Sequence, residues 1–305
     1  MLRVSIYKRA RSIKYSEWIT GYLFIAPIIL LMAVWFYYPL VNAFTTSLSD
    51  ANFIKLNEAR FIGLVNYFKV LKDPLFLNSL KISGTMVLVA VPLQALISLV
   101  LAVNLNSILK LKAFYRTVFY MPYITSTIAV TTVFMYLFVQ GGIATRLLAV
   151  FGFPDTSWYH DVEYALPFMI ILCIWTYIGF YVVVYLAGLQ AIPYELYESC
   201  TVDGANFFQK FLYVTVPMLR HTTTLVLISG TIYVLQFFDQ PYALARGSVL
   251  GSPAGATSTA VIFVYSEAFK NYKMGYGSAA AFLIFIIILS ITAVQKFVFE
   301  KQEGV

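Results

Sequence analysis

Six long apolar runs limit this chain to the folds of integral membrane proteins. The runs contain no Asp, Glu, Lys, Arg or His, and they cover residues 18–38, 82–109, 117–145, 164–189, 222–238 and 277–294. A helix of about 20 residues crosses the roughly 30 Å hydrocarbon core of a bilayer. The composition agrees, because only 11% of the residues are charged, against about 25% in soluble domains. We therefore predict an all-α membrane protein with six transmembrane helices.

The segment 1–17 precedes the first apolar run and is strongly basic. A cleaved signal peptide has an apolar core of about 7–15 residues that ends in small residues at the cleavage site. Run 18–38 is longer and has no such site. We predict that it is kept as the first span, with 1–17 as an N-terminal tail and 18–305 as one transmembrane domain.

The distribution of basic residues predicts the orientation in the membrane. Six spans place both termini on one side, and the first flank, which usually dominates orientation, carries five basic residues: Arg3, Lys8, Arg9, Arg11 and Lys14. Basic flanks favour the cytoplasm. We predict cytoplasmic N- and C-termini and an external segment 39–81. The net charge of +7 is then a feature of these flanks beside anionic lipid, so no nucleic-acid partner is predicted.

The loop 193–220 has sequence signals for a helix, a tight turn and a second helix. Pro193 suits the first turn of a helix, and Gly204 suits the left-handed position just after a helix end. Asn206 followed by Gln209 is a capping-box pattern that begins a second helix. Its apolar stripe, which we expect to end before Pro217, is Phe207, Phe208, Phe211 and Leu212. Periodicity alone is equally typical of an amphipathic helix that lies on the membrane surface.

The absence of ionisable residues from the spans indicates where the energy for uphill transport of a solute would come from. Proton-coupled carriers commonly keep such residues in the membrane to bind and release the proton. None is present here, so uphill transport would draw its energy from a partner protein. Sodium bound by backbone carbonyls and hydroxyls remains an alternative. Cys173 and Cys200 lie apart and indicate neither a disulfide framework nor a metal site.

The loop also carries a pattern that resembles a known family. Glu198-Ser199-Cys200, Gly204 and Val214-Thr215-Val216-Pro217 have the spacing of the Glu-Ala-Ala, x3, Gly, x9, Ile-x-Leu-Pro signature of permease subunits in bacterial ABC importers. Ser199 and Cys200 replace the two alanines. The chain is most similar to the carbohydrate-uptake branch, which includes maltose, multiple-sugar and glycerol-phosphate permeases. The segments that carry this likeness are 61–67, 115–122, 191–198, 203–205, 237–239, 251–253, 257–259 and 275–279.

This resemblance implies partners and a site of energy coupling. In the family, the loop forms coupling helices that dock on an ATP-hydrolysing subunit. The positions that match are Glu198, Ser199, Cys200, Asp203, Gly204, Ala205 and Pro217. The implied partners are a second homologous permease, two ATP-binding subunits and an extracytoplasmic solute-binding protein, in a bacterial cell membrane. ATP and Mg²⁺ would be bound by the ATP-binding subunits, and this chain would bind no cofactor or metal and have no catalytic residues.

Aromatic and polar residues of the fourth and fifth runs are candidates for a solute path. Sugars stack on aromatic rings and bind amides, hydroxyls and carboxylates. Tyr177 and Tyr181, and likewise Tyr233 and Phe237, are four residues apart and share a helix face. Gln236 and Asp239 add polar groups nearby. Because the chain contains 23 Tyr and 26 Phe, ordinary helix packing explains such pairs equally well.

We expect the chain to be a permease subunit of an ATP-driven importer of a sugar or oligosaccharide. A permease for glycerol phosphate or a related small solute is the nearest alternative. A sodium-coupled secondary carrier and a membrane protein with a purely assembling role are alternatives of other classes.

Overall fold

The computed structural model describes residues 18–55, 58–107, 112–245 and 249–300. The predicted tail 1–17 lies outside the described residues. Within them the chain is almost entirely helical, and the β-structure is a single bridge between Ser49 and Phe61. The all-α prediction is therefore confirmed.

Residues 18–32 are helical and continue into the first named elements. The elements before the hairpin described below are η1 (Ala33–Tyr37), α2 (Tyr38–Ser47), α3 (Val65–Leu71), α4 (Pro74–Ser107), α5 (Lys112–Ile124), α6 (Thr127–Leu137), α7 (Ile143–Ala149), η3 (Trp158–His160) and α8 (Ala165–Gln190). Those after it are α12 (Arg220–Leu235), α13 (Asp239–Ala245), α14 (Ala260–Tyr265), η5 (Ser266–Lys270) and α15 (Met274–Glu300).

Five helical segments are long and apolar enough to cross a membrane. They are Trp18–Ser47, Pro74–Ser107, Ala165–Gln190, Arg220–Ala245 and Met274–Phe299. The pair α5 and α6 passes the same test as one bent unit. Counting this pair as one span gives the predicted number of six.

The first span extends beyond its predicted end at residue 38. Its helix continues through a π-helical turn, η1, and through Pro39 to Ser47. Pro39 lies in the first turn of α2, a position where the missing N–H of proline is not needed. The segment 39–81 therefore begins as helix, and α4 likewise begins at Pro74 rather than at residue 82.

The third span differs most from expectation, because it is not a single straight helix over 117–145. α5 and α6 meet at an angle of 96°. Pro122 lies in the last turn of α5, and Ser126 has an extended backbone with φ −52° and ψ 125°. Proline removes a helical hydrogen bond, and an extended residue ends the helix, so the chain turns here.

α4 and α8 form the centre of the helix bundle. α5 packs on α8, α12 packs on both central helices, and α15 packs on α12 and α2. Gly179 makes the closest of these contacts possible, since a Cβ atom there would overlap the carbonyl of Phe119 on α5. α8 agrees closely with the predicted fourth span at 164–189.

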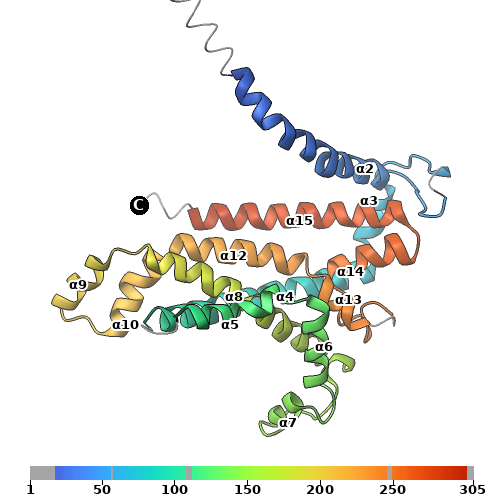
Figure 1. Ribbon diagram of the computed structural model, residues 1–305. Helices are drawn as coiled ribbons and strands as arrows, with labels where there is room; N and C mark the ends of the chain where they lie inside the picture. Colours follow the sequence, from blue (N-terminus) through green and yellow to red (C-terminus); the bar gives the residue numbers. More distant parts are fainter. Residues whose placement is uncertain (1–17, 56–57, 108–111, 246–248, 301–305) are drawn as a thin grey trace, which may run out of the picture.

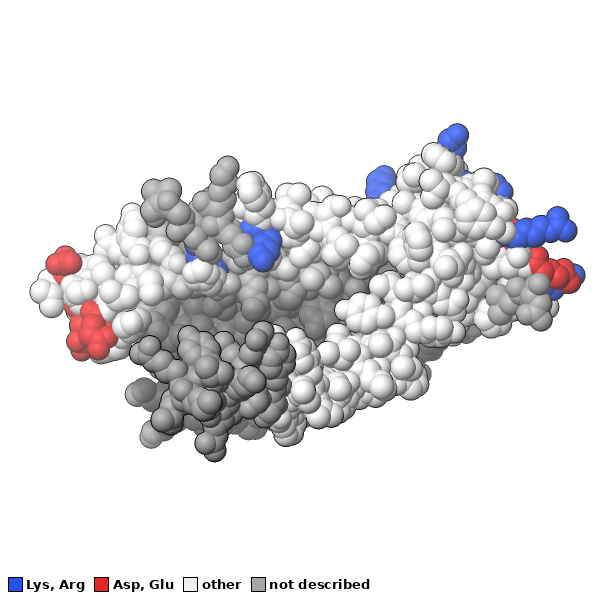
Figure 2. Space-filling view, turned by 90° about the horizontal axis from the view of Figure 1, so that it is seen from above, with Lys and Arg blue, Asp and Glu red and all other residues white. Residues whose placement is uncertain are grey.

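Charged side chains lie mainly at the two ends of the elongated molecule. Figure 2 shows acidic residues at one end, a mixed group at the other, and between them a broad face that is uncharged except for a few basic side chains toward the acidic end. Leu88 is 78% exposed on this molecule. An uncharged surface with exposed apolar side chains is what a lipid bilayer covers.

The N-terminal helix extends away from the rest of the bundle. Figure 1 shows that only its α2 end lies beside α15, where the rings of Phe44 and Phe282 are 5.3 Å apart. None of the most apolar 18-residue stretch of Trp18–Ser47 is buried. Except at its α2 end, this helix is therefore open to lipid or to another protein.

Candidate functional site: a helical hairpin and a tyrosine cluster

The segment 194–218, which we term the hairpin, forms one end of the molecule (Figure 1). It comprises α9 (Tyr194–Val202), α10 (Phe207–Lys210), η4 (Phe211–Thr215) and α11 (Val216–Met218). The predicted helix, turn and second helix are confirmed. The apolar stripe lies before Pro217 as expected, and the helix continues through Pro217, which follows the π-helical turn η4.

Backbone geometry explains the sharp turn between the two helices. Gly204 has φ +81°, the left-handed conformation that glycine adopts without a Cβ penalty. The N–H of Ala205 donates to the carbonyl of Cys200 at 2.9 Å, and the N–H of Gly204 donates to that of Thr201 at 3.1 Å. These two bonds form a Schellman motif, which satisfies the last carbonyls of α9.

The second helix begins with the predicted capping box. The N–H of Gln209 donates to the Asn206 side chain at 2.9 Å, and the N–H of Asn206 donates to the Gln209 side chain at 2.8 Å. These bonds satisfy two of the free N–H groups at the start of the helix. Both ends of the turn are therefore fixed by local sequence.

Two side-chain contacts hold the hairpin arms together. The hydroxyl groups of Tyr197 and Thr215 are 3.0 Å apart, and the Lys210 ammonium donates to the Thr201 hydroxyl at 2.7 Å. A groove of about 190 Å³ separates the hairpin from the ends of α4 and α8. The hairpin is therefore a defined structure rather than an irregular loop.

The tip of the hairpin exposes apolar side chains. Val202 is 87% exposed, Phe207 73% and Tyr213 74%. Of the predicted coupling residues, Glu198, Ser199, Asp203, Gly204 and Pro217 are exposed, while Cys200 and Ala205 are half-buried. An apolar knob bordered by carboxylates is typical of a surface that another protein covers.

A cluster of tyrosines joins α5, α8 and α12 in the middle of the bundle. The ring of Tyr177 stacks on Tyr233, with ring centres 5.7 Å apart. Tyr123 lies 6.0 Å from Tyr177, and Tyr120 lies 5.3 Å from Tyr123. We refer to these four residues as the tyrosine cluster.

The structure separates the predicted path residues into two groups. Tyr177 and Tyr233 meet in the tyrosine cluster, and Gln236 and Asp239 follow, exposed, at the end of α12 and the start of α13. Tyr181 and Phe237 are 1% and 2% exposed and pack in the apolar core. Phe237 lies after Leu235, the last residue of α12, so the predicted helix face shared by Tyr233 and Phe237 is not formed.

Sequence reasoning missed Tyr120 and Tyr123. Both lie on α5 close to Pro122, and their spacing of three residues was the available signal. The described residues contain no cluster of three or more His, Cys, Asp or Glu side chains suited to a metal ion.

Comparison with curated proteins identifies similar chains. This chain is 32% identical to the arabinooligosaccharides transport system permease protein AraP of Bacillus subtilis, over 93% of this chain and 90% of that protein. It is 34% identical to the trehalose/maltose transport system permease protein MalF of Thermococcus litoralis, over 92% of this chain and 94% of that protein. It is 30% identical to the sn-glycerol-3-phosphate transport system permease protein UgpA of Agrobacterium fabrum, over 96% of this chain and 98% of that protein.

A solved structure has the same fold. It is a chain of a bacterial ABC transporter involved in the import of the acidic polysaccharide alginate, with a TM-score of 0.78 and 19% identity. The match covers 96% of this chain and 99% of that one. Residues 85–303 match the family described as the binding-protein-dependent transport system inner membrane component. The chain therefore belongs to this family of multi-pass permease subunits of ABC importers.

Proposed function

We propose that this chain forms part of the translocation path of an ATP-driven carbohydrate importer. The observation that carries the proposal is the hairpin, an ordered helical structure with an exposed apolar tip at one end of the molecule. The most similar relatives support it, because several are permeases for oligosaccharides or disaccharides.

In this proposal the hairpin receives the energy for transport. Its end of the molecule would be cytoplasmic, and its tip would dock on one of two ATP-binding subunits, which bind ATP and Mg²⁺. Glu198 and Asp203 would face basic groups of that subunit, with Gly204 making the turn. The hydrogen bonds of Lys210 and Tyr197 hold the hairpin arms together, so movement of the ATP-binding subunits would be transmitted to α8 and α12 as rigid bodies.

The exposed N-terminal helix supports a second permease subunit as a partner. The most apolar stretch of this 30-residue helix is not buried, so it gains no packing energy within this chain. A second permease would supply the missing contacts and the other half of the path. An extracytoplasmic solute-binding protein is the further partner, and a structural relative was solved with an alginate pentasaccharide-bound periplasmic protein.

The tyrosine cluster supports a neutral carbohydrate as the solute. Aromatic rings from three helices offer faces for the C–H surfaces of a sugar, and Gln236 and Asp239 offer groups for its hydroxyls. A phosphate ester would instead require cations. Asp239, at the start of α13, disfavours the glycerol-phosphate alternative, although one relative transports that solute by name.

The proposed coupling can be tested with two substitutions in the hairpin. Glu198→Lys combined with Gly204→Pro should lower ATP-driven uptake by the purified complex at least tenfold, because both the charge and the turn are lost. The matched control is Glu163→Lys, the same charge reversal at an exposed residue outside the hairpin. Co-purification of the ATP-binding subunits should fall in the hairpin variant alone. Unchanged uptake and co-purification would contradict the proposed role.

A further inference from the structure

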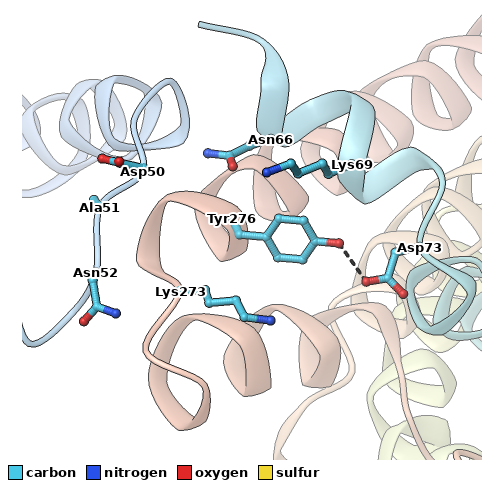
Figure 3. Close-up of a pocket in the computed structure, with 8 residues that line it drawn as sticks. All are labelled: Asp50, Ala51, Asn52, Asn66, Lys69, Asp73, Lys273 and Tyr276. Atoms are coloured by element: carbon cyan, nitrogen blue, oxygen red, sulfur yellow. Dashed lines mark hydrogen bonds between the residues drawn. The ribbon is translucent and has the colours of Figure 1, made fainter. Parts of the chain in front are cut away.

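A polar pocket (Figure 3) is formed by segments that lie at the end of the molecule opposite the hairpin (Figure 1). Its volume is about 400 Å³, within the range of about 300–1,000 Å³ that is usual for small-ligand sites. The chain after α2, helix α3 and the start of α15 form its walls. The charged and aromatic residues that line it are Asp50, Lys69, Asp73, Lys273 and Tyr276.

Three of these residues already have partners within the protein. Asp73 accepts hydrogen bonds from the Tyr276 hydroxyl at 2.7 Å and from the N–H of Leu75 at 2.8 Å. Lys273 forms an ion pair with Glu267 at 3.2 Å. Their charges and polar atoms are therefore largely used in holding the pocket together.

One cation and one carboxylate oxygen are left available to a ligand. The carbonyl of Lys69 accepts the N–H of Lys72 at 3.2 Å, but its ammonium group has no hydrogen bond or ion pair with any other residue that the structure describes. One oxygen of Asp50 accepts the N–H of Arg60 at 2.6 Å, and its second oxygen has no partner within the described part of the chain. Both residues line the pocket, and Figure 3 shows them on different segments, Asp50 on the chain after α2 and Lys69 on α3. A ligand that carries both an anionic and a cationic group satisfies both.

The position of the pocket indicates where such a ligand comes from. α2 ends at Ser47, α4 begins at Pro74 and α15 begins at Met274, so the pocket lies at the shared end of three apolar helices. α3 beside it is amphipathic. It buries Asn66 and Val70 and exposes one apolar face made by Leu64, Phe68 and Leu71. Such a helix lies in the headgroup region of a bilayer.

From these observations we propose that the pocket binds the headgroup of a phosphatidylethanolamine molecule of the surrounding membrane. Lys69 binds the phosphate, and Asp50 accepts hydrogen bonds from the primary amine. The exposed apolar face of α3 lies beside the acyl chains. The lipid thereby links the N-terminal helix, α3 and α15 at one level of the membrane.

The test uses the complete transporter complex in nanodiscs of phosphatidylcholine with a small fraction of dioleoylphosphatidylethanolamine. Lipid that stays bound after detergent extraction is quantified by mass spectrometry. Lys69→Ala should lower the bound phosphatidylethanolamine about tenfold, the effect of losing one charge-assisted hydrogen bond. Lys72→Ala is the matched control, since Lys72 is exposed at the end of α3 and does not line the pocket. Lys69→Arg should restore retention.

Other lipids and a soluble competitor distinguish phosphatidylethanolamine from other ligands that the pocket could bind. Phosphatidylglycerol lacks the amine and phosphatidylcholine lacks its N–H donors, so both should be retained about tenfold less than phosphatidylethanolamine. Soluble phosphoethanolamine should not displace the lipid. Equal retention in the Lys69 and Lys72 variants would overturn the proposal. Unchanged lipid retention with a loss of stimulation by the solute-binding protein would assign the pocket to a protein contact and overturn it as well.

Discussion

Gly179 is the residue at which the packing of this bundle is least tolerant. A Cβ atom at this position of α8 would overlap the carbonyl of Phe119 on α5. Backbone atoms cannot move aside as a flexible side chain can, so the two helices would have to separate. The contact of α5 with α8 also positions Tyr123 against Tyr177.

We predict that Gly179→Ala destabilises the protein by about 1–3 kcal/mol, the usual cost of overpacking. Gly84→Ala in α4 is the control, because a Cβ there meets nothing within 4 Å, and alanine is favoured over glycine inside a helix by up to about 1 kcal/mol. Thermal unfolding of the purified protein in detergent should show a lower midpoint for Gly179→Ala alone. Equal midpoints would show that the α5–α8 contact is looser than described.

A second prediction at the residue scale concerns Tyr233. Tyr233→Ala removes a ring that stacks on Tyr177, and we expect about tenfold weaker apparent affinity for the transported sugar, whereas Tyr233→Phe keeps the stacking face. Tyr136→Ala is the control, because Tyr136 is 71% exposed on α6. Uptake measured over a range of sugar concentrations gives the apparent affinity of each of the three variants. Unchanged affinity in Tyr233→Ala would exclude this residue from the solute path.

At the scale of elements, the segments that could be predicted are those fixed by local signals. Gly204 and the pair of Asn206 and Gln209 were sufficient to place the turn of the hairpin. α8 was likewise evident from its long apolar run. These features depend on backbone conformation and hydrophobicity within a few residues, which are properties of the sequence itself.

The elements that differed from prediction depend on tertiary context. Pro39, Pro92 and Pro217 lie in or beside helices that continue, yet the chain bends sharply between Pro122 and Thr127. The extended backbone of Ser126, the N-cap residue of α6, makes the difference together with Pro122. Serine is common at this position, but its side chain makes no capping hydrogen bond here. Tyr177 and Tyr181 do lie on one face of α8, but their spacing does not reveal which helix packs on that face. The end of α12 at Leu235, which leaves Phe237 outside the helix, was not evident either.

The loop between α6 and α8 gives a prediction about pH. The N–H of Gly141 donates to Asp155 at 2.8 Å, and this bond, with Thr145 and Arg146 nearby, lowers the pKa of Asp155 below its ordinary value. The bond therefore stabilises the loop above pH of about 4 and is lost as the pH falls through the lowered pKa.

Hydrogen exchange at the Gly141 amide measures this effect. We expect the amide to lose protection below pH of about 4, after correction for intrinsic exchange rates. Asp155→Asn should show reduced protection already at neutral pH. Protection that does not depend on pH in the unaltered protein would contradict this role of Asp155.

At the scale of the whole molecule, the chain is incomplete as a folded object. Its N-terminal helix buries none of its most apolar stretch, and the hairpin exposes an apolar tip at the opposite end of α8 from the polar pocket. Lipid covers apolar surface in the middle of the molecule, but the hairpin lies among charged residues. In the proposed importer, an ATP-binding subunit would cover the hairpin, and lipid or a second permease would cover the N-terminal helix.

Uptake by the purified complex in proteoliposomes tests the central claim most directly. The complex is supplied with solute-binding protein, radiolabelled oligosaccharide and either enclosed ATP with Mg²⁺ or an inward sodium gradient. We predict uptake with ATP alone, and none with the sodium gradient alone. Uptake that persists without ATP and follows the sodium gradient would contradict the assignment and support a secondary carrier.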